Sequence, residues 1–177
     1  ELDGEVVVRA DPQIGYLHTG FEKLGEHRSL TQFVTLTDRL NYMSPLTNNI
    51  GLVYAAERML GVEPTPRCVA IRVVLAELSR IADHIICCGL TGMDLGAFSV
   101  MLWCFEERER LYDIFEAVTG TRLTTSYTRV GGLARDVHAD FVPQVRAVLA
   151  RIPELVKDVR TMLARNRIFT DRMHGVG

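Results

Sequence analysis

The chain has 177 residues and 47% of them are apolar, which fits a folded domain that buries its own hydrophobic core. The formal net charge is −2 at neutral pH and neither sign forms a long run, so the composition argues against nucleic acid as a partner. The sequence begins at Glu1 and ends without a terminating pattern, and we expect it to be an excerpt of a longer chain.

The N-terminal part predicts a small β element followed by two helices. Residues 5–10 are rich in β-branched side chains and predict a short strand within a strand region at 1–18, with its sheet partners outside the excerpt. Glycines between residues 15 and 25 predict a strand-to-helix turn, with a helix starting near Thr19 or Gly20. Apolar residues at helical spacing predict a second helix over 29–40.

Two further helices follow in the middle of the chain. Ser44 as N-cap and Pro45 at the first position predict a helix over 45–60, closed by Gly61. The most regular apolar spacing predicts a helix from residue 67 to about 90. Three glycines at 89–96 predict a break after it.

The last third predicts more helix. One helix is expected from about residue 97 to Gly120, and the Thr-rich segment 121–130 predicts a strand or an extended connector. The apolar stripe from Phe141 to Leu163 predicts one helix kinked at Pro153, or two collinear helices. The expected fold is therefore mainly α, a bundle of long helices with a small N-terminal β element.

Signals for metal binding, membrane insertion and export are missing. The cysteines show no Cys-x-x-Cys spacing and no neighbouring pair of histidines, so they predict buried thiols and no metal site. No apolar run approaches the roughly 18 to 20 residues that span a bilayer, and nothing resembles a signal peptide, which is typical of a cytosolic environment. The cysteines are Cys68, Cys87, Cys88 and Cys104.

Charged residues of two helices predict a structural ion network. Glu77, Arg80 and His84 are three and four residues apart, so they share one helix face. Arg108 lies on the apolar stripe of the next helix, where a charge needs a partner. Glu77 is the candidate partner for Arg108.

The polar connection 37–49 is the main candidate for a functional site, because loops held between helices often present side chains to ligands. Tyr42 in this loop would be a neutral hydrogen-bond donor to a carbonyl of an apolar ligand. Asp94, just ahead of the next helix, is expected to share a cleft with Tyr42. Plain helix capping explains the same residue types and stays an alternative for both segments.

No glycine-rich phosphate loop, His-Glu-x-x-His or Gly-x-Ser-x-Gly motif is present, so the residues alone predict a helical domain with a small-molecule cleft. Several motifs, in order along nearly the whole chain, resemble the D subunit of bacterial NADH:quinone oxidoreductase, respiratory complex I. They are Ile14–His18, Gly20–Leu24, Asp38–Pro45, Glu57–Gly61, Ile71–Val73, Glu77–Ile81, Met93–Ala97, Phe105–Glu109 and Arg129–Gly132. The resemblance implies that residues 1–177 are the central helical-bundle part of such a subunit, with its N- and C-terminal parts missing.

The resemblance also implies a function. The subunit would help to form the quinone chamber of a proton-translocating enzyme, in the peripheral arm on the cytoplasmic side of the bacterial inner membrane. A partner subunit would hold the terminal 4Fe–4S cluster, and NADH would be oxidised on other subunits of the complex. Tyr42, with Met43 beside it, matches the tyrosine that binds the quinone headgroup. Asp94 matches the aspartate that pairs with a histidine from an upstream loop absent from the excerpt, a histidine distinct from His18.

The same family is similar to the large subunit of nickel–iron hydrogenases. A metal-binding cysteine pair of the hydrogenases corresponds to Asn41 and Ser44, so no nickel site is expected. Thr19 and Thr124 stand where many members carry an arginine and a histidine, and loss of a titrating neighbour predicts a weaker pH dependence of the partner cluster's potential. The alternatives are a related hydrogenase-like or ferredoxin-linked quinone oxidoreductase and a non-catalytic helical assembly subunit.

Overall fold

The structure is a computed structural model that describes residues 1–175. Over these residues the chain forms seven helices and two hairpins of short strands, which confirms the mainly α prediction. The helices are α1 (Phe21–Gly25), α2 (Leu30–Thr37), α3 (Pro45–Leu60), α4 (Pro66–Asp94), α5 (Phe98–Thr119), α6 (Phe141–Ala164) and α7 (Arg167–Met173). The strands are β1 (Leu2–Asp3), β2 (Val6–Val7), β3 (Thr128–Arg129) and β4 (Gly132–Leu133).

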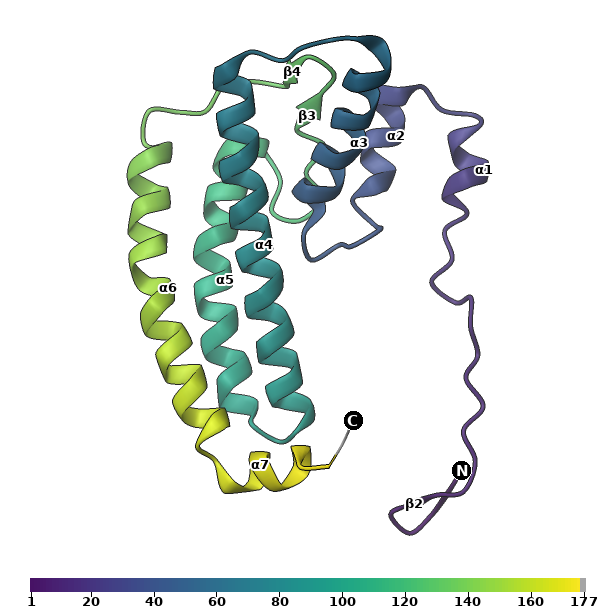
Figure 1. Ribbon diagram of the computed structural model, residues 1–177, viewed down its shortest axis with the longest axis vertical. Coiled ribbons are helices and arrows are strands. Elements are labelled where there is room, and N and C mark those ends of the chain that lie inside the picture. The colour runs from purple at the N-terminus through teal and green to yellow at the C-terminus, as the bar shows by residue number, and fades with distance from the viewer. Residues whose placement is uncertain (176–177) are drawn as a thin grey trace.

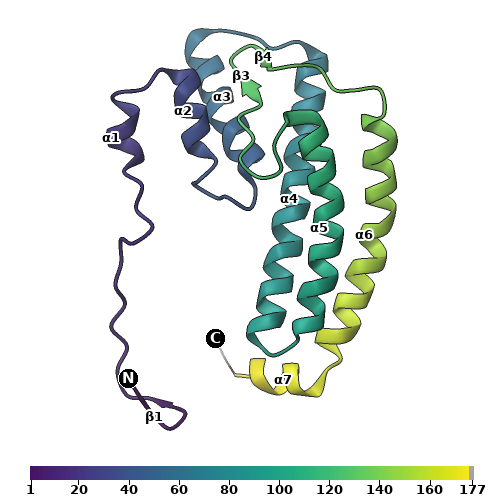
Figure 2. The same cartoon turned by 180° about the vertical axis from the view of Figure 1, so that it is seen from behind.

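Three long helices form the body of the molecule (Figure 1). Helix α5 packs against both α4 and α6, so the three lie side by side with α5 in the middle. Helices α2 and α3 and the β3–β4 hairpin lie beside the upper half of α4, and α7 lies across the lower end of the long helices (Figure 2). Apolar side chains from the facing sides of α4, α5 and α6 form the core, and their burial is the main stabilising contribution.

The N-terminal segment extends away from the helices in Figures 1 and 2. Residues Val6 and Val7 pair antiparallel with Leu2 and Asp3, so the predicted strand finds its partner inside the chain and the expectation of an outside partner for it was wrong. Residues 1–19 are exposed, including apolar side chains such as Leu17. This segment contributes nothing to the hydrophobic core described above.

The end of α4 differs from the prediction. The glycines at 89 and 92 do not break the helix, which continues to Asp94. They are buried where α4 meets α5, and a Cβ on Gly89 would lie 2.9 Å from the Cβ of Cys104. Glycine at these positions therefore allows α4 and α5 to pack closely. Each glycine costs the helix about 1 kcal/mol relative to alanine, which does not prevent the helix from continuing.

Two other expectations can be compared with the structure. Helix α6 runs through Pro153 as one helix, as the apolar stripe predicted. Within the Thr-rich segment 121–130, only Thr128 and Arg129 are in a strand. Across residues 1–175, no helix combines the length and the apolarity that crossing a bilayer requires.

Candidate functional site

The loop that carries Tyr42 is fixed by hydrogen bonds to two helices. The Asn41 amide Nδ2 donates to Ser44 Oγ at 2.7 Å and to Asp83 Oδ2 on α4 at 3.0 Å. The Asn48 amide on α3 donates to the Asn41 carbonyl at 3.0 Å. Ser44 is the residue before α3, as predicted, but its side chain makes no hydrogen bond that caps the helix. The loop is therefore held by contacts with both α3 and α4.

Tyr42 projects from this loop with 56% of its surface exposed. Met43 beside it is half-buried. An exposed phenol on a fixed backbone can meet a ligand without rearrangement of the loop, which reduces the entropy lost on binding.

The start of the loop is anchored by a buried amide. Asn49 of α3 is fully buried, and its Nδ2 donates to the Val34 carbonyl, to Thr37 Oγ1 and to Asp38 Oδ1 at 3.0, 2.9 and 2.8 Å. The Thr125 hydroxyl donates to Asn49 Oδ1 at 3.1 Å. Burial raises the pKa of the Asp38 carboxyl above its ordinary value, and the hydrogen bond from Asn49 acts in the opposite direction. These contacts tie α2, α3 and the 121–127 segment together.

Asp94 lies lower on α4. It is the exposed last residue of α4 and lies four residues before α5 begins at Phe98, as predicted; Ala97, not Asp94, holds the N-cap position of α5. Asp94 lies eleven residues after Asp83 (94 − 83), which is about three helical turns or ~16 Å along the axis. The structure thus separates Asp94 from the Asn41 contact by more than a third of α4, and the shared cleft stays a prediction.

A cavity of about 440 Å³ begins one residue after Asp94. It lies between the α4–α5 connection, the start of α5, the end of α6 and α7. Its lining includes Ala97, Phe98, Ile168 and Phe169, and the Arg172 guanidinium donates to the Leu95 carbonyl beside it. The sequence patterns did not predict this cavity, because α7 reaches it from a segment more than 70 residues further along the chain.

The predicted ion network divides into separate contacts. Glu77 and Arg80 form an exposed ion pair, and His84 is exposed. Arg108 does not pair with Glu77 as predicted. Its guanidinium lies 4.1 Å from the ring centroid of Tyr112 and donates to the Tyr112 hydroxyl at 2.9 Å. Arg108 Nη1 also lies 3.6 Å from Glu109 Oε1, so a neighbouring carboxylate and the ring face, which attracts a cation, take the place of Glu77.

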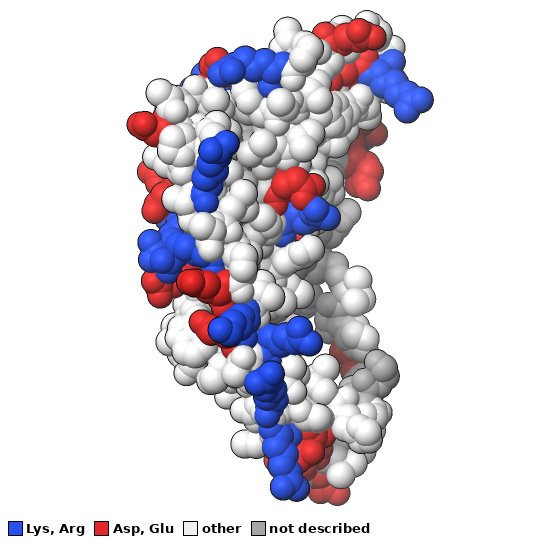
Figure 3. Space-filling view, turned by 60° about the vertical axis from the view of Figure 1, so that its left-hand side comes forward, with Lys and Arg blue, Asp and Glu red and all other residues white. Residues whose placement is uncertain are grey.

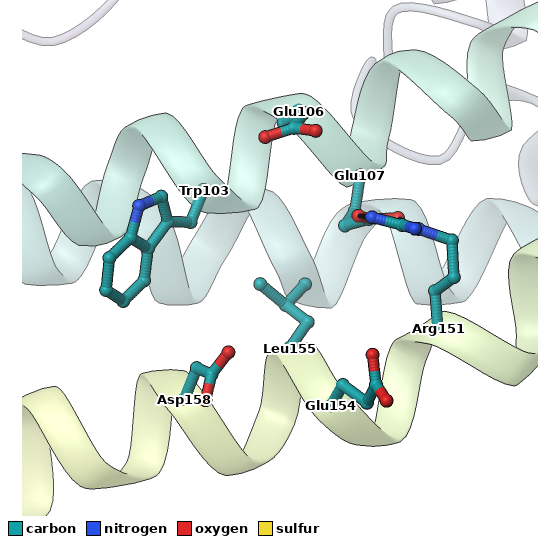
Figure 4. A pocket seen from close by; sticks show the side chains of 7 residues that line it. All are labelled: Trp103, Glu106, Glu107, Arg151, Glu154, Leu155 and Asp158. Atoms are coloured by element: carbon teal, nitrogen blue, oxygen red, sulfur yellow. Dashed lines mark hydrogen bonds and ion pairs between the residues drawn. The ribbon is translucent and has the colours of Figure 1, made fainter.

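A second ionic contact, which was not predicted from the sequence, lies between α5 and α6. Figure 4 shows Glu107 and Arg151 pointing toward one another at one end of a pocket that also contains Trp103 and Asp158. Arg151 donates to both oxygens of the buried Glu107 carboxylate at 2.9 Å, which lowers the pKa of Glu107. The sequence could have indicated this contact, because Glu107 lies at helical spacing between the buried residues Cys104 and Leu111 of α5.

The other features of the site concern charge and metals. Acidic and basic side chains are interspersed on the face shown in Figure 3. Within residues 1–175 no group of three or more His, Cys, Asp or Glu side chains is arranged to hold a metal ion.

Cys68 and Cys104 are buried as predicted. The prediction was wrong for Cys87 and Cys88, which are exposed because neither falls on the buried stripe of α4 that runs through Ile86 and Gly89.

Comparison with known proteins shows similarity to subunits of respiratory-chain NADH dehydrogenases. Residues 94–177 match the family described as "Respiratory-chain NADH dehydrogenase, 49 Kd subunit". The whole chain is 51% identical to a D subunit of NADH-quinone oxidoreductase from Sorangium cellulosum, covering 44% of that protein. It is 46% identical to a D subunit of the same enzyme from Opitutus terrae and 45% identical to the one from Akkermansia muciniphila, covering 42% and 43% of them.

Over residues 94–177 the chain thus matches the family of this 49 kDa subunit, and relatives that align with the whole chain are named as D subunits of NADH-quinone oxidoreductase. It spans less than half the length of the relatives it matches.

Proposed function

We propose that this chain is the part of a D subunit that presents Tyr42 to quinone in a proton-translocating NADH:quinone oxidoreductase. The observation that carries the proposal is the fixed loop with its exposed phenol, in a chain whose relatives are named as D subunits of NADH-quinone oxidoreductase. The Tyr42 hydroxyl donates a hydrogen bond to a quinone carbonyl oxygen. Met43 supplies an apolar contact next to the ring.

Reduction of the quinone consumes two electrons and two protons. In this proposal a 4Fe–4S cluster on a partner subunit would supply the electrons one at a time. Tyr42 donates a proton to the oxygen that gains negative charge, and a donor in that position stabilises the charge as it develops. Asp94 pairs with a histidine supplied from outside these residues and orients it to donate the second proton to the other oxygen; protons from solvent then restore Tyr42 and the histidine.

The lining of the cavity next to Asp94 suits an apolar ligand. Aliphatic and aromatic side chains are prominent in the lining named above, and pockets of this kind bury the apolar part of a ligand while a few polar groups fix its orientation. Asp94 directly precedes Leu95, the first residue of that lining, but is not itself part of the lining.

The other subunits supply what this chain lacks. NADH is oxidised elsewhere in the complex, and the chain works in the peripheral arm on the cytoplasmic side of the bacterial inner membrane. Its partners are the iron–sulfur subunit and the other peripheral-arm and membrane subunits of complex I.

The test is Tyr42→Phe in the assembled enzyme. We expect quinone reduction to fall by about 10²-fold or more, because a positioned proton donor contributes about 10²- to 10⁴-fold. Cluster content and NADH oxidation by an artificial acceptor stay normal. Tyr54→Phe is the matched control, since Tyr54 is a partly exposed tyrosine on α3 outside the loop. Unchanged quinone reduction by Tyr42→Phe would favour a non-catalytic assembly subunit.

A further inference from the structure

Asp38 is a buried carboxylate placed four residues before Tyr42. It follows the last residue of α2 and is 1% exposed. Its Oδ1 accepts from Asn49 Nδ2 at 2.8 Å, and Asn49 Oδ1 in turn accepts from the Thr125 hydroxyl at 3.1 Å. Arg39 Nη1 lies 3.9 Å from Oδ2, on a half-exposed side chain. The carboxylate is thus held by α3 and, through Asn49, by the 121–127 segment.

The loop between α2 and α3 has two anchors, with Tyr42 next to the second of them. The first is Asp38 with Asn49, and the second is Asn41 with Asp83 of α4. Around the first anchor the Leu40 N–H donates to the Thr37 carbonyl, and after the second the Ser44 N–H donates to the Asn41 carbonyl across the turn that contains Tyr42. Because Tyr42 itself is exposed, these anchors fix its backbone in place of contacts of its own ring.

We propose that Asp38 is a positioning residue for the quinone reaction and sets the place and direction of the Tyr42 hydroxyl. The inference rests on the proposed function, and it assigns to Asp38 no contact with quinone. Asp38 acts through the loop, and an error of about 1 Å in placing a reacting group can reduce a rate by about 10²-fold.

The effect of Asp38 on position can be separated from its effect on stability. A carboxylate whose pKa is raised by burial is less favourable when ionised in the folded chain than in the unfolded chain. Neutralising it as Asp38→Asn therefore removes an unfavourable charge. In the variant, the amide oxygen replaces Oδ1 and can still accept from Asn49. The amide nitrogen replaces Oδ2 and can only donate, so one of the two acceptors of the carboxylate is lost.

The experiment measures quinone reduction by the assembled enzyme with wild-type, Asp38→Asn, Tyr42→Phe and doubly substituted subunits. We expect kcat/KM for quinone to fall about 10- to 100-fold for Asp38→Asn, with normal cluster content. The double variant should be no slower than Tyr42→Phe, because a residue that acts only through the Tyr42 hydroxyl has no further effect once that hydroxyl is gone.

Glu107→Gln is the matched control, because Glu107 is also a buried carboxylate but lies on α5 in contact with Arg151. Its kcat/KM should stay at the wild-type value, which excludes general destabilisation as the cause. Should Asp38→Asn fail to assemble, Thr125→Val removes only the hydroxyl that donates to Asn49. It should give a smaller fall in kcat/KM with the same absence of additivity.

The outcomes separate the two proposals. A slow Tyr42→Phe together with a normal Asp38→Asn overturns the inference and leaves the proposed function standing. Additive losses in the double variant also overturn it, since Asp38 would then act elsewhere. A normal Tyr42→Phe overturns the proposed function, and with it the role of Asp38.

Discussion

Arg72 of α4 and Glu57 of α3 form a buried ion pair with two parallel hydrogen bonds of 2.8 and 2.7 Å. The same guanidinium donates to the carbonyls of Arg129 and Gly132, and Glu57 Oε1 accepts from the N–H of Gly131. Gly131 has φ 80°, which suits glycine in the turn between β3 and β4. One ion pair thus holds the hairpin against two helices.

Removing one partner of this pair should be strongly destabilising. Arg72→Met leaves the Glu57 carboxylate buried without its counterion, and we expect the free energy of unfolding to fall by about 3–5 kcal/mol. Urea denaturation measures it. Arg80→Ala is the control, because it breaks the exposed pair with Glu77 and should change stability by less than about 1 kcal/mol. A similar loss for both variants would contradict the role of burial.

Acid should weaken the same contact. The hydrogen bonds from Arg72 lower the pKa of Glu57 from its ordinary value of 4.5. A carboxyl with a lowered folded-state pKa contributes stability that is fully present above its unfolded-state pKa and is lost as the pH falls through the folded-state value. We therefore expect unfolding free energy to fall below about pH 4.5. In Glu57→Gln this decline should be smaller; an equally steep decline would assign it to other carboxyls.

The close contact of α4 and α5 predicts opposite effects of adding a methyl group at two helical glycines. At Gly89 the new Cβ would lie 2.9 Å from the Cys104 Cβ and 3.4 Å from the Met101 Cα, so Gly89→Ala should destabilise by about 1–3 kcal/mol. At Gly51, exposed on α3, no atom lies within 4 Å, and Gly51→Ala should stabilise by about 0.5–1 kcal/mol. Thermal unfolding compares the two. Equal shifts would mean that helix propensity alone decides.

Thiol reactivity should divide the cysteines by burial. Burial raises the pKa of Cys104 to about 11, and the thiolate is the reactive form. Iodoacetamide near pH 8 should therefore modify the exposed Cys87 and Cys88 at least about tenfold faster than Cys104. Mass spectrometry of digested protein follows each site. Fast modification of Cys104 in native protein would show that α4 and α5 separate readily.

Periodicity predicted the long helices, because apolar residues repeat along α4, α5 and α6 at the spacing of a helix face. It failed at Gly89 and Gly92, where contact with α5 outweighs the low helix propensity of glycine. It also failed for Arg108, whose partner Tyr112 lies one turn away on the same helix.

The candidate site could be predicted only in part. Tyr42 and Asp94 stood out by their local sequence, and the family resemblance gave them roles that remain predictions. The contact of Thr125 with Asn49 joins residues 76 positions apart, and no local pattern indicates such a pair. The burial of Asp38 and its link to the 121–127 segment through Asn49 could therefore not be inferred from the sequence.

Helix α4 sets the distance between the two ends of the candidate site. Asp83 accepts the hydrogen bond from Asn41, and Asp94 lies further along the same continuous helix. The distance between these two residues therefore cannot change unless α4 bends or unwinds. A change at the site must then come from the loop, from α7 or from neighbouring chains, while α4 keeps its length.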